Sequence, residues 1–440
     1  MKKRRRNYSI IAIVLVLCMA LLLVSCGQKT ANDENTAGNG TQSQESGDGG
    51  GGDSESETGT QELTGSSVVT ESGKAMDEAM RKAYASFAYR LFGTCAEGEK
   101  SSCLVSPFSV YAALGMLANG AAGETAAQMD AVLGLTEAER NAYFAGWANR
   151  LAKTEETVFT CADSVWIANR MRRFVPKDFL AACAGFYGAE MYATDMNNAT
   201  VRAVNDWVNF HTKQMIPKII EENELDPGTS IILINAISLD AKWAFPFCTD
   251  LIRKDTPFTH EDGKTEKVEM LCGEADSGFL ENDFVTGCVK SYKDGGFRYV
   301  ALLPKEGVTL DQAVASLTPD SFDALLAGAS DGDVNLYIPK YTVKFRKKLN
   351  DDLKSLGMKD AFGARADFSR MLTCGGASVD EVIHETCLSL DNEGTKAAAV
   401  TYISVKNTSI RTTYTVRLDR PFLYMIIDEN NLPIFLGTYR

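Results

Sequence analysis

The chain has 440 residues, of which 45% are hydrophobic and 23% are charged, and this composition is typical of a protein with a folded core. Its formal net charge of −13 argues against nucleic acids and anionic lipid surfaces as partners, because they carry negative charge as well. The three histidines show no HExxH pattern and no metal-ligand spacing, so the sequence predicts neither a metal nor a cofactor.

The first 25 residues have the organisation of an export signal. Five basic residues at positions 2–6 precede an apolar run at 10–24, which is shorter than the roughly 20 residues of a membrane-spanning helix. The run ends in Leu-Val-Ser-Cys at 23–26, which resembles a bacterial lipobox. We therefore expect residues 1–25 to be removed and Cys26 to be lipidated. The alternative is a plain secretory signal or a short anchor in which Cys26 is incidental.

Residues 26–74 follow as a low-complexity tract rich in Gly, Ser, Thr, Asp and Glu. The tract has too few apolar residues to offset the entropy of ordering, so we expect a flexible tether spanning roughly 40 Å root-mean-square. Loss of residues 1–25, with five basic residues and no acidic ones, lowers the formal net charge from −13 to −18. The predicted location is the outer face of a bacterial cell membrane, with the lipid as the only membrane contact.

Residues 75–440 are expected to form one large domain. Helical periodicity dominates from 74 to 135, whereas short alternating strands prevail beyond 231. Because helices and strands segregate along the chain, the predicted class is α+β.

Nine cysteines remain once Cys18 leaves with the signal and Cys26 is lipidated. They are Cys95, Cys103, Cys161, Cys183, Cys248, Cys272, Cys288, Cys374 and Cys387. An odd number cannot pair completely, and the spacings include no CxxC, so we expect most to be free and buried.

A GxSxG pattern at 328–332 places Ser330 in the arrangement used by some hydrolases. A nucleophile elbow needs a strand before the serine and a helix after it. Here the expected helix, 321–327, comes first and the expected strand, 334–338, follows. The sequence therefore does not predict an enzyme.

Residues 391–405 have the pattern of an insertable strand. One face carries only uncharged side chains, at 395, 397, 399, 401, 403 and 405, and the other carries Lys396 and Lys406. Gly394 provides a hinge, because it lacks a Cβ atom. Three alanines at 397–399 favour a turn followed by a helix instead. The β-branched residues from 400 onward favour a strand.

Six short segments, in order, resemble the serpin family of serine protease inhibitors across about 75–440. They are 105–129, which contains VSPFSVYAALGM, 235–247, 338–341, 356–369, 420–424 and 433–437. The resemblance implies three β-sheets surrounded by about eight or nine helices, and an exposed, insertable reactive-centre loop at about 394–415.

The resemblance also implies a function. A serpin is a suicide substrate, which traps a serine endopeptidase as an acyl-enzyme when its cleaved loop inserts into the central sheet. The expected protein is a monomer without enzyme activity or cofactor. Its expected partners are serine proteases, and the family also allows some cysteine proteases.

Particular residues acquire roles by this resemblance. The hinge is Glu393, Gly394, Thr395, Ala397, Ala398 and Ala399, and the polar cluster where the sheet opens is Ser106, Ser109, Asn235 and His384. The expected reactive bond joins Thr408 to Ser409, which suits elastase-like proteases. Lys406 or Arg411 would instead present a trypsin-like site.

Three positions depart from the family pattern. They are Ser102, Asn392 and Gln214, where the family usually has Asn, Glu and Gly. None lies in the small-residue run at 397–399. Two alternatives stay open: a non-inhibitory serpin that serves as a surface binding or carrier module, and a purely structural surface lipoprotein.

Overall fold

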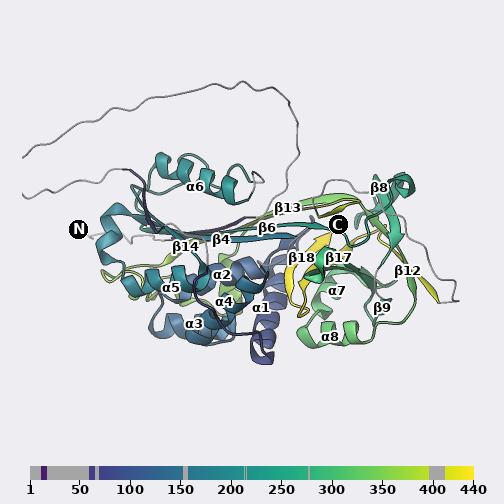
Figure 1. Cartoon of the computed structure of the whole chain (residues 1–440), viewed down its shortest axis with the longest axis horizontal. Helices are drawn as coiled ribbons and strands as arrows, with labels where there is room; N and C mark the ends of the chain where they lie inside the picture. The colour runs from purple at the N-terminus through teal and green to yellow at the C-terminus, as the bar shows by residue number, and fades with distance from the viewer. Residues whose placement is uncertain are drawn as a thin grey trace, which may run out of the picture.

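The computed structural model describes residues 59–64, 69–151, 157–212, 214, 216–275, 278–395 and 412–440, and also the backbone of 11–16. These residues form nine α-helices and three β-sheets (Figure 1). The predicted α+β class and the three sheets are confirmed.

Most of the helices lie on one side of the largest sheet, and α6 lies on the other side (Figure 1). The helices are α1 Glu78–Ala96, α2 Pro107–Ala118, α3 Gly123–Leu133, α4 Glu137–Leu151, α5 Lys177–Tyr187, α6 Asn198–His211, α7 Leu310–Ser316, α8 Pro319–Ala327 and α9 Asn350–Leu356. Short 3₁₀ turns are η1 Asn169–Phe174, η2 Thr249–Leu251, η3 Lys293–Gly295 and η4 Asp360–Phe362. Within the described ranges, no helix is long and apolar enough to cross a membrane.

Helix α2 lies at the centre of the molecule. Ser106 caps its N-terminus by accepting from the backbone N–H of Ser109, and Pro107 occupies the first turn, where its missing N–H costs nothing. All twelve residues are buried, which explains why the segment is apolar on every side.

The largest sheet has the strand order β13-β14-β1-β6-β4-β5-β2, with β15 paired to β6. The strands are β13 Tyr341–Lys348, β14 Val379–Leu390, β1 Ile11–Val16, β6 Ile231–Lys242, β4 Val158–Ala168, β5 Glu190–Thr194, β2 Gln61–Thr64 and β15 Gly394–Thr395. Strand β6 is buried along nearly its whole length, because α2 contacts it on one face and residues of α6 pack on the other. Such two-sided cover explains its continuous apolar run.

The space between β6 and β14 holds a further strand. There the backbone of β1 runs parallel to both neighbours, with Ile11 paired to Ile231 and Val14 to Ile383. Strand β15 instead runs antiparallel to β6, at the opposite end of that strand. The sheet thus has room for one strand between β6 and β14.

The other two sheets pack at the far end of the molecule. One has the order β3-β18-β17-β11-β10-β9 and the other β16-β12-β8-β7. Their strands are β3 Leu104–Val105, β18 Pro433–Tyr439, β17 Phe422–Asp428, β11 Phe297–Pro304, β10 Val285–Ser291, β9 Leu280–Glu281, β16 Thr413–Arg417, β12 Asp333–Pro339, β8 Thr265–Glu274 and β7 Arg253–Thr259.

The last part of the predicted tether lies against the domain. Strand β2 pairs antiparallel with β5, and the backbone N–H groups of Thr70 and Glu71 both donate to the carbonyl of Gly185. The edge of β5 offers unpaired backbone groups that a passing segment can satisfy, which composition alone does not reveal.

Candidate functional site

The site begins where β14 ends and the chain reverses direction. The carboxylate of Asp391 accepts from the backbone N–H groups of Glu393 and Gly394, at 2.9 and 3.1 Å. The N–H of Asp391 donates back to the carbonyl of Gly394 at 3.0 Å. This tight turn directs the following residues back along the sheet toward β6.

Gly394 and Thr395 form the short strand β15, which pairs antiparallel with Lys242 and Ala241 at the end of β6. A Cβ atom on Gly394 would lie 2.1 Å from the carbonyl oxygen of Ala241, so only glycine fits this close approach. The side chain of Thr395 is buried, and its hydroxyl lies 2.5 Å from the hydroxyl of Tyr292. The first two hinge residues that follow the turn therefore already belong to the sheet.

Backbone groups just beyond β6 hold this turn in place. The N–H of Trp243 donates to the carbonyl of Glu393 at 2.9 Å, and the N–H of Phe247 donates to the carbonyl of Asn392 at 2.8 Å. The indole of Trp243 also donates to the carbonyl of Asp391 and stacks on the ring of Tyr292. Residues 241–247, at and just beyond the end of β6, thus hold residues 392–395 in place.

A second cluster lies at the middle of the sheet, under the space between β6 and β14. Ser109 donates to the side-chain oxygen of Asn235, and the backbone N–H of Ser106 donates to Nε2 of His384 at 3.0 Å. The four side chains are fully buried, and burial lowers the pKa of His384 to about 3, so its imidazole is neutral. The structure brings together the four residues of the predicted cluster, from α2, its cap, β6 and β14.

The sequence analysis missed one member of this cluster, Asp163 on β4. Its carboxylate accepts from the side-chain amide of Asn235 at 2.8 Å, and burial raises the pKa of Asp163 to about 7. The ionisable groups that face it are Cys161 on its own strand and Cys183 and Tyr187 on α5. The signal was an acidic residue inside an otherwise uncharged, buried strand.

Other predicted residues lie outside the described ranges. Ala397, Ala398, Ala399, Lys406, Thr408, Ser409, Arg411 and Cys26 all belong to this group. The described ends of the loop are Thr395, on β15, and Thr412, whose carbonyl accepts from the N–H of Asp333 at 3.0 Å.

Ser330, His211 and His260, the residues that could suggest catalysis, each have different hydrogen-bond partners. Ser330 exchanges two backbone hydrogen bonds with Phe279, and it follows helix α8 and precedes strand β12. His211 pairs with Glu190, and His260 contacts Glu266 and the carbonyl of Arg440. Among the described residues, no group of three or more His, Cys, Asp or Glu side chains could hold a metal ion.

Nine cysteines fall within the described ranges, and no disulfide joins any of them. Six are buried, one is intermediate and two, Cys248 and Cys374, are exposed. The large sheet therefore carries no covalent cross-link within these ranges that would oppose its opening.

Comparison with known proteins identifies the family. The family model described as Serpin (serine protease inhibitor) matches residues 82–440. This chain belongs to the serpin family, as its motifs predicted, and it has the serpin fold.

Three relatives illustrate the match. Tengpin, a thermophilic serpin solved in its native state, is 34% identical, with 87% of this chain and 99% of that chain covered and a TM-score of 0.78. Leukocyte elastase inhibitor of Sus scrofa is 27% identical, with coverage of 82% and 98%. Thyroxine-binding globulin of Rattus norvegicus is 28% identical, with coverage of 80% and 86%. The family thus includes relatives named for protease inhibition and for ligand binding.

Proposed function

We propose that this serpin is a suicide-substrate inhibitor of serine endopeptidases. The observation that carries the proposal is the position of β15, because Gly394 and Thr395 already run antiparallel along the end of β6. Residues that continue in the same direction would enter the space between β6 and β14. That space holds a strand in the structure, so its width suits the proposed insertion.

The proposed reaction starts when the catalytic serine of a protease attacks the carbonyl carbon of Thr408. The bond to Ser409 breaks, the new amine leaves, and Thr408 stays joined to the protease as an ester. The cut releases the hinge side of the loop, which continues the pairing begun by Thr395. Serpin loop insertion is itself a recognised example of strand addition and of released strain.

Insertion supplies enough free energy to trap the enzyme. About ten new ladder hydrogen bonds at about 1 kcal/mol each, with burial of the uncharged face, give on the order of 10 kcal/mol. That free energy rivals the whole stability of a typical domain. Displacing the catalytic groups of the attached protease by about 1 Å can slow deacylation by about 10²-fold. Inhibitor and protease are then consumed together.

Two finer assignments belong to the same proposal. Thr408 is small and β-branched, so it suits the shallow primary pocket of elastase-like enzymes, and the relative named leukocyte elastase inhibitor supports this choice. Lipidation of Cys26 would hold the inhibitor at the outer face of a bacterial membrane, where exported proteases act.

The competing function is a non-inhibitory carrier, which the relative named thyroxine-binding globulin brings into view. Small hinge residues, Thr395 and then Ala397 to Ala399, favour inhibition, because they can enter a sheet interior without burying charge.

Equimolar mixing with a panel of serine proteases separates the two functions. An inhibitor abolishes the proteolytic activity of at least one elastase-like enzyme in the panel. It also forms a complex with that enzyme that survives denaturing electrophoresis. A carrier leaves every protease active, whether or not its loop is cut.

A further inference from the structure

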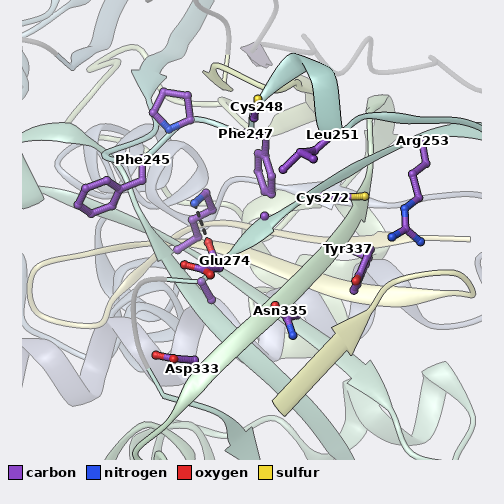
Figure 2. A pocket seen from close by; sticks show the side chains of 14 residues that line it. Phe245, Phe247, Cys248, Leu251, Arg253, Cys272, Glu274, Asp333, Asn335 and Tyr337 are labelled. Carbon is purple, nitrogen blue, oxygen red and sulfur yellow. Dashed lines mark hydrogen bonds between the residues drawn. The ribbon is translucent and has the colours of Figure 1, made fainter. Parts of the chain in front are cut away.

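An open pocket of about 940 Å³ is lined by residues that follow β6 and by residues of β7, β8, β10 and β12 (Figure 2). Phe247 on its wall donates its backbone N–H to Asn392 on the hinge side. Asp333, also on its wall, donates its backbone N–H to Thr412 on the far side. The volume is within the range of roughly 300–1,000 Å³ that small-molecule sites occupy.

One side of the pocket is apolar and unusually accessible. Phe245 and Leu251 are 48% and 57% exposed, and the ring of Phe247 lies beside Leu251 (Figure 2). A Cβ atom on Gly273 would lie 2.7 Å from the ring of Phe247, so the glycine lets that ring occupy its place. Large apolar side chains that gather around a concavity, rather than singly on a surface, indicate a binding site.

Arg253, on the pocket wall, places a cation at one end of the pocket. The guanidinium groups of Arg253 and Arg417 lie 5.2 and 4.0 Å from the ring centroid of Tyr337, so one ring holds both. The planar guanidinium group of Arg253 offers charged N–H donors to a carboxylate or sulfonate, and Arg417, outside the pocket lining, adds positive charge nearby.

The acidic wall residues lie elsewhere. Figure 2 shows Arg253 directed toward Tyr337, whereas Asp333 lies at the opposite end of the pocket and Glu274 lies on the far side from Arg253. Lys290 is buried, donates to the backbone carbonyl of Glu274, and lies over the ring of Phe247. An anionic group therefore finds its best position at the arginine end.

We propose that this pocket binds a small amphipathic anion. The apolar body, an aromatic ring system or a short alkyl chain, packs on Phe245, Phe247 and Leu251. A single carboxylate or sulfonate group binds the guanidinium group of Arg253. This binding does not depend on inhibition of a protease.

The test is a fluorescence titration of the purified full chain with 8-anilinonaphthalene-1-sulfonate, an aromatic sulfonate of this class. An uncharged analogue, N-phenyl-1-naphthylamine, is titrated in parallel. The variants are Arg253→Glu and Leu251→Asp, whose side chains are exposed and outside the core. Phe210→Ala is the matched control, because Phe210 is 76% exposed on α6, away from the pocket.

The proposal predicts saturable binding of the sulfonate to the wild type. Arg253→Glu weakens sulfonate binding by about tenfold and leaves the uncharged analogue unaffected, because only the charge contact is reversed. Leu251→Asp weakens both probes, and Phe210→Ala weakens neither.

Two results overturn the proposal. One is equal sulfonate binding by the wild type, Arg253→Glu and Leu251→Asp. The other is loss of binding in Phe210→Ala. If the three titrations are equal and Leu251→Asp instead slows complex formation with a protease, the pocket is a protein contact surface and not a small-anion site.

Discussion

The hydroxyl oxygen of Thr395 lies 2.5 Å from the phenolic oxygen of Tyr292, and both side chains are buried. Burial raises the pKa of Tyr292, so its phenol stays protonated and the two hydroxyls share one hydrogen bond. Tyr292 also stacks on Trp243, and the backbone N–H of Trp243 donates to the carbonyl of Glu393. The start of the hinge is thus fixed by both its side chain and its backbone.

A double-mutant cycle measures this contact. Tyr292→Phe leaves the Thr395 hydroxyl buried without its partner, and Thr395→Val does the same to Tyr292, so each lowers the free energy of unfolding by about 1 kcal/mol or more. In the double variant the loss is smaller than the sum by about 1 kcal/mol. Urea unfolding of the uncleaved protein gives all four values. Strictly additive losses would show that the two hydroxyls do not interact.

Asp163 and His384 are both buried, and their pKa shifts predict opposite pH effects on stability. The pKa of Asp163 rises from 3.8 to about 7 on folding, so the native state binds more protons than the unfolded state, and stability falls as the pH rises from about 4 to about 7. The pKa of His384 falls from 6.5 to about 3, so stability falls as the pH drops from about 6.5 to about 3. Between about pH 4 and 6.5 the two contributions oppose one another.

Two variants separate these contributions. Relative to the wild type, Asp163→Asn gains stability as the pH rises from 4 to 7, because it lacks the carboxylate that must ionise. His384→Gln gains stability relative to the wild type as the pH falls from 6.5 to 4. Each difference changes by up to about 1.4 kcal/mol per pH unit, measured by urea unfolding. Differences that stay flat across this range would show that neither group carries a shifted pKa.

Mass spectrometry of the C-terminal fragment released by an elastase-like protease identifies the reactive bond. We expect a fragment that begins at Ser409, because Thr408 suits a shallow primary pocket. A fragment that begins at Asn407 or Thr412 would place the cut after Lys406 or Arg411 and assign the inhibitor to trypsin-like proteases.

Cys26→Ala tests the lipid anchor. The variant lacks the thiol that would carry the lipid, so we expect it to move from the membrane fraction to soluble material. Protease inhibition should be unchanged, because Cys26 lies well before the residues that form β2. Retention in the membrane fraction after a high-salt wash would contradict lipidation and favour an uncleaved anchor.

Sequence patterns predicted the α+β class, and the family resemblance predicted the three sheets and proposed the residues of the central polar cluster. Helix α2 and strand β6 are each apolar along their length and lie within family motifs, so their positions followed from pattern and order. His384 and Asn235 could be grouped only through the family resemblance, because they are 149 positions apart and reach the same level of the sheet only when β6 and β14 flank β1.

Sequence patterns could not predict contacts between segments that are distant in the chain. Asp163 was missed because its partner, Asn235, lies on a neighbouring strand, and a single acidic residue does not indicate which group donates a hydrogen bond to it. The pairing of β2 with β5 was missed because a polar tract can be ordered by an exposed sheet edge without burying apolar surface. Tyr292, the partner of Thr395, carried no local signal at all.

The variant Thr395→Arg tests most directly whether insertion traps the protease. Arginine at this position must place a charge where Thr395 is buried, which costs several kcal/mol, so insertion slows and loses its race with deacylation. The matched control is Thr395→Val, which keeps the shape and adds no charge. Both variants are mixed at equimolar ratio with an elastase-like protease and resolved by denaturing electrophoresis. The account predicts that Thr395→Arg is cleaved without forming a stable complex, whereas Thr395→Val still traps the enzyme. A Thr395→Arg variant that traps the protease one-to-one would contradict loop insertion as the inhibitory step.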